Sequence, residues 1–390
     1  MITRAGAVLG GAGAVLLGAG MWADYPELVM LGLACAAALT AAAGWMLVRP
    51  RLAVAREISP SRVPEGTPAY GVLSVTNTGR RRSPPSLAVE TVAGRRVVVP
   101  LPSLPAGDTF DTTYALPAQR RGRHLLPPLA VGHADPLRLC QVVRTGGAEA
   151  VLYVHPTVHQ VAPMPLGGPR DLEGPTSASS PQGGVAFHSL RDYQPGDDWR
   201  RIHWASTART GTLLVRYNVV PDEPHHLVVL DTSEKPYDDA FEDAFEDAVR
   251  VAASVCDASA RAGFSVTCRT TGHPAEADGH VPPAASAVTS ALDVLSAARP
   301  SPGDPGLSAL GGLVTELAAG EGSALTVVTG QGESRGPELL ATLPPSFSAA
   351  ALVRIGRTLP VSSTVAAGVF TIDARTSREF AVRWNQLFAR

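Results

Sequence analysis

The sequence is poor in lysine, aromatic residues and net charge. Lys235 is the only lysine among 33 basic residues, and with 35 acidic residues the formal net charge is −2. A near-neutral chain with only 5% aromatic residues lacks the dense basic face that nucleic-acid binding requires, so we expect no nucleic-acid partner. With 45% hydrophobic residues, disorder throughout the chain is not expected either.

Cysteine is scarce, and common catalytic motifs are missing. The four cysteines, Cys35, Cys140, Cys256 and Cys268, form no C-x-x-C pair for zinc or redox work. We expect them to be small buried residues in a reducing compartment. The sequence contains no P-loop, zinc-ligand pair or G-x-S-x-G elbow. No motif therefore indicates a reaction, and we expect a protein that is not an enzyme.

Charge is almost absent from residues 1–48, where only Arg4, Asp24 and Glu27 are charged. Two apolar runs, Ala5–Trp22 and Leu28–Val48, fill this region. As helices they would be about 27 and 31 Å long, enough to cross a hydrocarbon core of about 30 Å. Residues 1–48 are therefore predicted to form a transmembrane hairpin.

Small residues recur at helical spacing in both apolar runs. The pairs are Gly6 with Gly10, Gly32 with Ala36, and Thr40 with Gly44. Such surfaces let two helices approach closely in lipid.

Arginines near the ends of the apolar runs set the expected orientation. Arg4 precedes the first run and Arg49, Arg51 and Arg56 follow the second, whereas the connector has only acidic charges. The positive-inside rule then predicts a two-pass protein of the plasma membrane, in contact with the lipid bilayer and with both termini in the cytoplasm. The first run could instead be a cleaved signal peptide, and residues 49–390 would still be cytoplasmic.

Short strands separated by turns follow the apolar runs, so residues 49–160 are predicted to form an all-β, sandwich-like module. The expected strands are Tyr70–Asn77, Arg96–Leu101, Phe110–Leu116, His124–Val131 and Ala150–Val154. Residues 161–184 are rich in Pro, Gly and Ser and are predicted to form a linker.

Residues 185–220 combine glycine, aspartate, arginine and aromatic residues more densely than any other stretch. Pro195-Gly196 is typical of a type II turn, after which Asp197 or Asp198 can cap a helix of about ten residues. Alternating apolar residues predict a strand from Leu213 to Val220.

This segment resembles the signature of the bacterial domain-of-unknown-function 58 family, F-x-x-L-R-x-Y-x-x-G-D-x-x-R-x-I-x-W, then A-R and a strand ending V-R. The matching residues are Phe187, Leu190, Arg191, Tyr193, Gly196, Asp197, Arg200, Ile202, Trp204, Ala208, Arg209, Val215 and Arg216. Asp135-Pro136-Leu137 also resembles the family's D-P-x-G-L, with Arg138 in place of the glycine. The resemblance implies two spans, a β domain and a von Willebrand factor A-like C-terminal domain.

Two interpretations of this signature segment remain open. It can be a recognition patch for a phosphate or a partner loop. The candidate binding residues are Arg191, Tyr193, Gly196, Asp197, Arg200, His203, Trp204 and Arg209. Alternatively it is a buttress, with its arginines paired to Asp192, Asp197 and Asp198 and its aromatic residues packed against the following domain. His203 has no nucleophile at a recognisable spacing, so we assign no catalytic residue.

Strands alternate with helices over residues 221–390, which predicts a multidomain protein ending in a largely parallel α/β, Rossmann-like sheet. The expected strands are His226–Asp231, Phe264–Arg269, Ala324–Thr329, Phe347–Ile355 and Val365–Ile372. The expected helices are Asp238–Ala262, Ala284–Ala298, Gly306–Ala319 and Ser377–Ala389.

A candidate metal loop follows the first of these strands. Asp231 and Ser233 match the start of the D-x-S-x-S pattern with which related A-domains hold a divalent cation, so they are candidate Mg²⁺ ligands. Lys235 stands at the second serine position, and Thr329 stands where many such domains place an aspartate. The loop is either a weak metal site or a remnant, and no other cofactor is expected.

Two functions of different class are compatible with this sequence. The family resemblance implies a non-catalytic, membrane-anchored scaffold or adaptor on the cytoplasmic side that acts with a MoxR-type AAA+ ATPase. The alternative is a divalent-metal-dependent ligand-binding A-domain or an uncharacterised enzyme. The lack of a catalytic motif favours the adaptor.

Overall fold

The computed structural model describes residues 2–46, 50–165, 188–194, 199–218, 225–237, 241–272, 287–316, 323–332, 338, 340, 347–366 and 368–388. The chain divides into two compact units, Met1–Thr157 with Leu295–Ala297, and Val158–Val294 with Ala298–Arg390.

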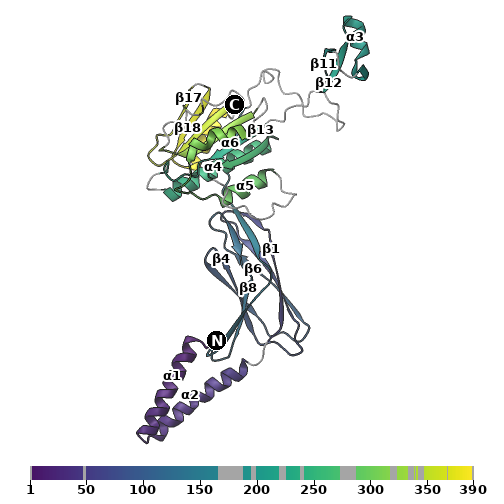
Figure 1. Ribbon diagram of the computed structural model, residues 1–390. Coiled ribbons are helices and arrows are strands. Elements are labelled where there is room, and N and C mark those ends of the chain that lie inside the picture. The colour runs from purple at the N-terminus through teal and green to yellow at the C-terminus, as the bar shows by residue number, and fades with distance from the viewer. Residues whose placement is uncertain are drawn as a thin grey trace. The chain divides into compact units, whose positions relative to one another are not determined.

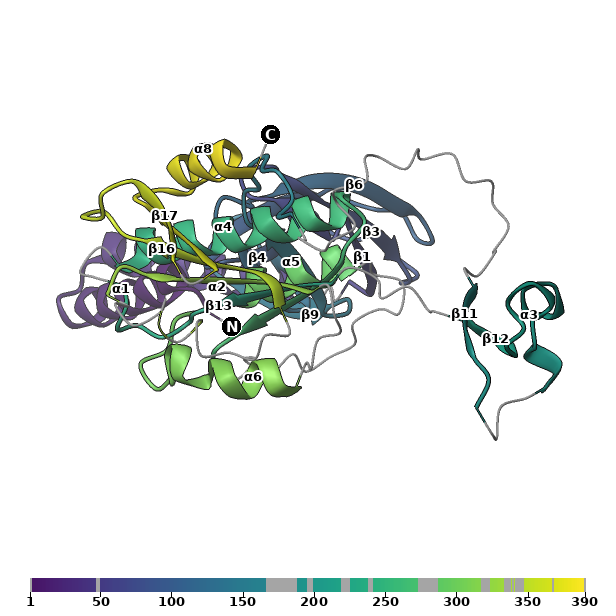
Figure 2. The same cartoon turned by 90° about the horizontal axis from the view of Figure 1, so that it is seen from above.

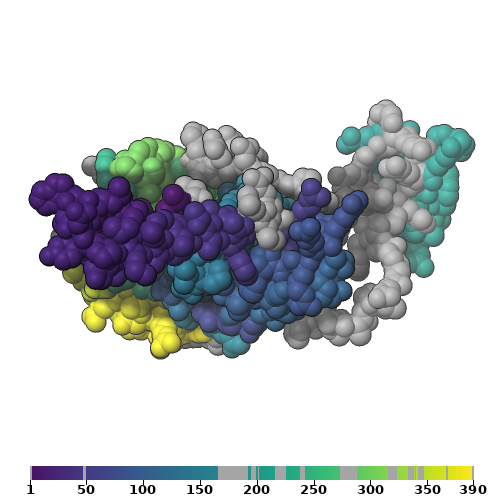
Figure 3. Space-filling model, turned by 90° about the horizontal axis from the view of Figure 1, so that it is seen from below, coloured from purple at the N-terminus to yellow at the C-terminus, as the bar shows by residue number. Residues whose placement is uncertain are grey.

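Two apolar helices, α1 (Arg4–Trp22) and α2 (Pro26–Trp45), open the first unit and lie side by side (Figure 1). Thr3 caps α1, because its hydroxyl oxygen accepts a hydrogen bond from the Gly6 amide at 3.0 Å. By length and composition both helices could cross a membrane. Their large apolar side chains are mostly exposed. In Figure 3 the surface of the two helices, coloured purple, is visible. The two expected apolar helices are confirmed, although α2 ends at Trp45 rather than Val48.

Glycines allow α1 and α2 to approach closely, and one of them, Gly32, belongs to a pair that the spacing suggested. Gly13, Gly20 and Gly32 are buried, and a Cβ on each would lie 2.8, 2.8 and 2.5 Å from the nearest atom of the other helix. Gly44 has nothing within 4 Å of such a Cβ, and the Thr40 hydroxyl donates to carbonyls of its own helix. The prediction for Thr40 and Gly44 is therefore wrong.

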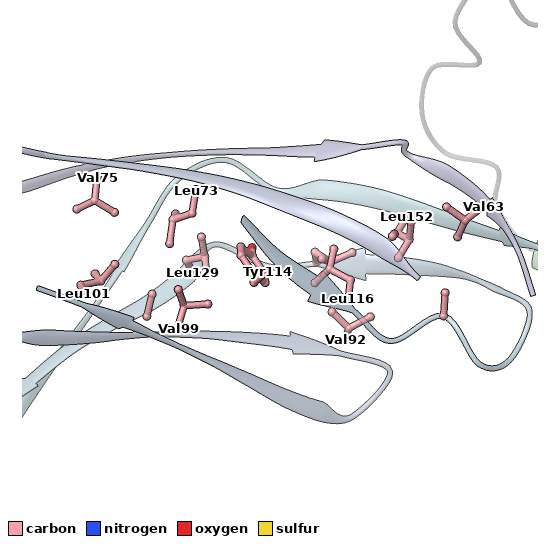
Figure 4. Close-up of a cluster of buried hydrophobic side chains, with 14 of the residues drawn as sticks. Val63, Leu73, Val75, Val92, Val99, Leu101, Tyr114, Leu116, Leu129 and Leu152 are labelled. Carbon is pink, nitrogen blue, oxygen red and sulfur yellow. The ribbon is translucent and has the colours of Figure 1, made fainter. Parts of the chain in front are cut away.

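Residues 50–157 contain strands and turns. The strands are β1 (Leu52–Ser59), β2 (Arg62–Pro64), β3 (Ala69–Asn77), β4 (Ser86–Val92), β5 (Arg95–Leu101), β6 (Thr109–Leu116), β7 (Gly122–Leu126), β8 (Leu129–Ala134), β9 (Gln141–Gly146) and β10 (Ala150–His155). They form sheets of order β1-β3-β6, β2-β10-β7 and β5-β4-β8-β9. One apolar core lies between the facing sheets, and Leu73, Leu129 and Leu152 are among its fully buried side chains (Figure 4). The expected all-β character is confirmed.

The expected strand His124–Val131 is instead two strands, β7 and β8. Pro127 and Pro128 separate them. Proline has no backbone N–H to donate and is poorly tolerated within a sheet, so the pair ends one strand before the next begins.

A buried ion pair joins β1 and β4. Arg56 Nη1 lies 2.8 Å from Glu90 Oε1, and neither side chain has exposed surface. The Tyr114 hydroxyl donates to Glu90 Oε2 at 2.8 Å, and Arg56 Nη2 donates to the carbonyls of Leu126 and Ala148. Arg56 was counted among the arginines flanking the apolar runs, but it is not a free charge beside them.

The turn after β8 contains the stretch that resembles D-P-x-G-L. Asp135 is buried, and its carboxylate accepts hydrogen bonds from the amides of Leu137 at 2.9 Å and Cys140 at 2.5 Å. Arg138, at the family's glycine position, has φ of 55°. This left-handed conformation costs a residue with a Cβ roughly 1–2 kcal/mol. Arg138 thus adopts the backbone conformation that a glycine would adopt easily at this position.

The second unit is built on a six-stranded sheet of order β14-β13-β15-β16-β18-β17. The strands are β13 (His225–Leu230), β14 (Ser265–Thr270), β15 (Ser323–Gly330), β16 (Phe347–Ile355), β17 (Ser362–Ala366) and β18 (Val369–Ala374). Neighbours are parallel except for β17, which is antiparallel to β18. The sheet is therefore largely parallel, as expected.

Helices cover both faces of this sheet. They are α4 (Phe241–Arg261), the 3₁₀ helix η2 (Gly306–Ala309), α6 (Leu310–Glu316) and α8 (Ser377–Phe388). A further helix, α5, runs from Ala287 to Ala297, and its last three residues belong to the first unit. In Figure 2, α4 and α8 lie on one face and α6 on the other. Phe380 and Trp384 of α8 are fully buried.

Two expected elements of this unit are wrong in detail. The strand expected over Val365–Ile372 is the β17–β18 hairpin, which turns at Gly368 with φ of 79°. A positive φ is easily adopted by glycine, and it reverses the chain here. The helix expected to begin at Gly306 starts with a 3₁₀ turn before α6.

The segment 158–165 belongs to the second unit. The His159 amide donates to Ser254 Oγ at 2.9 Å, and Trp384 Nε1 donates to the Ala162 carbonyl at 2.7 Å. Residues 161–164, assigned above to the linker, are thus held on the α/β unit, and 166–184 lie outside the described residues.

Three of the four cysteines, Cys140, Cys256 and Cys268, are buried as expected, and all four are free thiols. Cys256 lies on α4 and Cys268 on β14. Their mutual hydrogen bond, followed by burial, raises the pKa of the Cys256 thiol well above its usual value. A thiol held protonated in this way packs as a small apolar side chain.

Candidate functional site

The signature segment folds as a two-stranded hairpin that carries a short helix. Its elements are β11 (His188–Asp192), the 3₁₀ helix η1 (Trp199–Arg201), α3 (Trp204–Thr210) and β12 (Leu214–Asn218). In the antiparallel register, Arg191 lies opposite Val215. Val215 also forms a β-bridge with Ile202, and both are buried. This small apolar contact holds η1 against β12.

His203 begins α3 and acts as its N-cap. Its Nδ1 accepts a hydrogen bond from the Ser206 amide at 3.2 Å and lies 2.8 Å from Ser206 Oγ. Because Nδ1 satisfies a helix-start amide, the contact is a cap and not the beginning of a nucleophile–base pair. Ser206 was not singled out from the sequence, although its place three residues after a helix cap is a recognisable signal.

Two tryptophans of the signature segment are open to solvent. Trp199 is 67% exposed and Trp204 64% exposed. The Arg200 guanidinium carbon lies 6.0 Å from the centre of the Trp199 ring, and Arg209 is exposed in the last turn of α3. No described residue of the hairpin itself covers either tryptophan.

The remaining candidate binding residues are only partly placed. Tyr193 is half-buried, and its amide donates to the Leu213 carbonyl at 2.8 Å, extending the hairpin. Gly196 and Asp197 lie outside the described residues, so the expected turn stays a prediction. The expected helix of about ten residues is wrong: the chain forms η1 and then the seven-residue α3, which His203 caps.

The Asp231 loop follows β13 at the carboxyl edge of the parallel sheet. Asp231 is fully buried. Its Oδ1 accepts hydrogen bonds from the Ser233 amide at 3.0 Å and the Ser233 hydroxyl at 2.7 Å. Its Oδ2 accepts one from the Thr329 hydroxyl at 2.7 Å. The threonine that replaces the expected aspartate is therefore a direct partner of Asp231.

A second carboxylate, Asp304, completes the cluster. Its Oδ2 accepts hydrogen bonds from the hydroxyls of Thr232 at 2.5 Å and Thr271 at 2.9 Å. The Thr271 hydroxyl also lies 3.4 Å from Asp231 Oδ1, which joins the two carboxylates. Asp304 and Thr271 are not predicted from the sequence, because each lies in a loop whose approach to Asp231 depends on strand order.

Two neighbours show how closely this cluster is packed. Gly306 has φ of 63°, and a Cβ there would lie 2.8 Å from Ser233 Oγ. The Tyr237 hydroxyl donates to the Asp231 carbonyl at 2.8 Å. Burial, followed by the charges of Asp231 and Asp304, raises the pKa of Tyr237 well above its usual value, so the phenol stays neutral.

The cluster offers oxygen ligands only: two carboxylates and the hydroxyls of nearby serine and threonine residues. Hard oxygen donors of this kind suit Mg²⁺ or Ca²⁺. Lys235 is exposed, and no contact of its ammonium group with the cluster is seen among the described residues. No group of three His, Cys, Asp or Glu residues forms a metal-binding set in the part of the chain that the structure describes. Binding of such a cation would therefore depend on Asp231, Asp304 and the neighbouring hydroxyls.

Solved structures resemble this chain only distantly. The CARDB domain of a Pyrococcus furiosus protein, in complex with di-metal ions, is 17% identical, with 27% of this chain and 93% of that chain covered and a TM-score of 0.21. The DNA glycosylase AlkC of Pseudomonas fluorescens is 13% identical, with 31% and 39% covered and a TM-score of 0.19. Likenesses this weak carry no information about function.

Curated proteins provide no match to this chain. Residues 189–313 match the family described as protein of unknown function DUF58. The matched range begins in the signature hairpin and extends through the Asp231 loop into α6, about a third of the chain. For this part of the chain, the match supports membership in the DUF58 family.

Proposed function

We propose that this protein is a membrane-anchored scaffold or adaptor of the plasma membrane, faces the cytoplasm, and acts with a MoxR-type AAA+ ATPase without catalysing a reaction. In this proposal α1 and α2 are the anchor, and the C-terminal unit is a von Willebrand factor A-like domain. The signature hairpin is the surface that contacts the partner.

The exposure of Trp199 and Trp204 carries this proposal. Tryptophan and arginine dominate the binding energy of protein interfaces, and here both types occur together on η1 and α3. The pair projects from a fold whose own apolar contact is made by Ile202 and Val215. The hairpin therefore keeps its shape without covering the tryptophans, as a docking surface requires.

Affinity purification of the full-length protein in mild detergent, with and without ATP, tests this function. We expect a MoxR-type ATPase to be enriched with the wild type and its recovery to fall about thirtyfold in Trp199→Ala or Trp204→Ala, the effect of losing a hot-spot residue worth about 2 kcal/mol. Tyr70→Ala is the matched control, because Tyr70 is a half-exposed aromatic residue on β3. Repeated failure of folded wild-type bait to enrich such an ATPase would contradict the proposal.

A second candidate function is metal-dependent ligand binding at the Asp231 loop. The meeting of Asp231 and Asp304 across shared threonine hydroxyls favours it. Mg²⁺ would be held by these carboxylates with the hydroxyls of Ser233 and Thr271, and would offer an open position to an acidic group of a ligand.

Calorimetric titration of the full-length protein with MgCl₂ tests this second function. The proposal expects a saturable heat that Asp304→Asn abolishes, since the amide keeps the shape of the side chain but removes its charge. Asp257→Asn is the control, because Asp257 pairs with Arg261 on the exposed face of α4. No heat from a wild-type protein that melts cooperatively would exclude this site.

A further inference from the structure

A cavity of about 610 Å³ lies at one end of the β module, where the chain arrives from α2. Its volume is within the roughly 300–1,000 Å³ of small-molecule sites. β1 forms one wall and β8 and β9 the other, and Ala43 of α2 and Met46 also line it. The cavity is therefore next to the end of the second apolar helix.

The strand register directs two polar side chains into this cavity. His133 pairs with Val142, Val131 with Arg144, and Leu129 with Gly146 across β8 and β9. Directly paired residues point to the same face, and Leu129 belongs to the core between the sheets. His133 and Arg144 therefore face the interior of the sandwich at its open end.

His133 is buried, and one of its ring nitrogens, Nε2, lacks a hydrogen bond. Its side chain is only 7% exposed, and Nε2 makes no hydrogen bond with any described residue. Burial, followed by the positive charge of Arg144, lowers the pKa of His133, so the imidazole is neutral at pH 7. A buried ring nitrogen of this kind costs free energy until it is bound to something.

The charge of the cavity selects an anion. Arg51 and Arg144 both line it and are exposed, and none of the described lining residues is acidic. Arginine forms strong paired hydrogen bonds with phosphate. A neutral His133 can add a third donor from Nε2.

The rest of the lining is apolar and suits a hydrocarbon chain. Met46, Leu52, Val54, Val131 and Val142 supply this surface. Only residues 47–49 separate Met46 from Pro50, and both line the cavity. If α2 spans the bilayer, the cavity lies where phospholipid headgroups lie.

We propose that this cavity binds an anionic phospholipid of the surrounding bilayer. Arg51 and Arg144 bind the headgroup phosphate, His133 donates from Nε2 to a phosphate oxygen, and the apolar wall receives the upper part of one acyl chain. The inference rests on the membrane anchoring in the proposed function and is independent of the ATPase partner.

Native mass spectrometry of the full-length protein in detergent micelles tests the lipid site. Titration with dioleoyl-phosphatidylglycerol should give one tightly retained lipid, with at least about tenfold weaker retention of dioleoyl-phosphatidylcholine, the size of one charged hydrogen bond. Arg144→Gln and His133→Phe should each weaken retention of phosphatidylglycerol about tenfold. Arg95→Gln, which changes an exposed arginine of β5, should leave retention unchanged.

Further measurements separate the possible failures. Inorganic phosphate at 10-fold excess over lipid should not displace phosphatidylglycerol; if it does, the site binds free phosphate and the lipid assignment is wrong. Equal retention of both lipids, or wild-type retention by a folded Arg144→Gln, also overturns it. In liposome flotation, a protein that fails to float refutes the anchor and the lipid site together, whereas a floating protein without lipid preference refutes the lipid site alone.

Discussion

Replacing Glu90 with alanine should lower the free energy of unfolding of the β module by about 3–5 kcal/mol, because the change leaves the Arg56 guanidinium charged and unpaired inside the core. Both partners of the pair are completely buried. The substitution also removes the acceptor of the Tyr114 hydroxyl. Urea unfolding followed by hydrogen exchange at β4 amides measures the loss in this unit alone.

A double variant distinguishes two contributions to the free energy of unfolding: the cost of leaving Arg56 charged without a partner, and the contribution of the ion pair itself. The double change Arg56→Met with Glu90→Leu should be much less destabilising than Glu90→Ala, since apolar residues of similar volume often replace a buried pair without loss. Asp257→Ala, which breaks the exposed pair with Arg261, should cost at most about 1 kcal/mol. A Glu90→Ala protein as stable as Asp257→Ala would contradict the burial of the pair.

Arg56 also shows where sequence reasoning reached its limit in the β module. Its position seven residues after Arg49 suggested a charge at the membrane surface, but β1 alternates and Arg56 falls on the inward face with Val54 and Ile58. Its partner is 34 residues away on β4, a strand that was not predicted. The local alternation of apolar and polar residues does not reveal a contact between residues this far apart in the sequence.

The C-terminal unit was more predictable, because its strands are apolar runs bounded by turns. Asp231 was found since it directly follows such a strand, and parallel strands gather functional loops at one edge. Asp304 was not found, because it follows no strand and reaches the cluster from the loop before η2. Thr329 was read as a missing aspartate, yet its hydroxyl binds Asp231.

In the signature segment, the alternation of apolar residues predicted the second strand of the hairpin, β12, but neither its first strand, β11, nor which side chains are covered. Ile202 and Trp204 are two residues apart, and only Ile202 is buried. The expected helix of about ten residues is instead η1 and α3, with Ile202 and His203 between them, so Ile202 and Trp204 do not follow regular helical spacing.

Acidification from pH 6.5 should destabilise the second unit through His226. Its ring nitrogens lie 2.6 Å from Ser259 Oγ and 2.8 Å from Thr326 Oγ1. Burial, followed by the charge of His225, lowers the pKa of His226 to about 3. The unfolded chain binds a proton below about pH 6.5 and the native state only near pH 3, so stability falls as the pH drops, by about 1.4 kcal/mol per pH unit for this group.

Hydrogen exchange of β13 amides, corrected for intrinsic rates, measures this dependence between pH 6.5 and 5, above the range in which ordinary carboxylates titrate. The wild type should lose about 2 kcal/mol across this window. His226→Gln, which can still bond both hydroxyls but does not titrate, should lose markedly less than the wild type. Its remaining loss would come from His159 and His225, whose pKa values burial also lowers. His225→Gln should retain most of the wild-type slope, because it removes only the smaller of the two causes that lower the pKa of His226. Equal slopes in the wild type and His226→Gln would show that another group binds the proton.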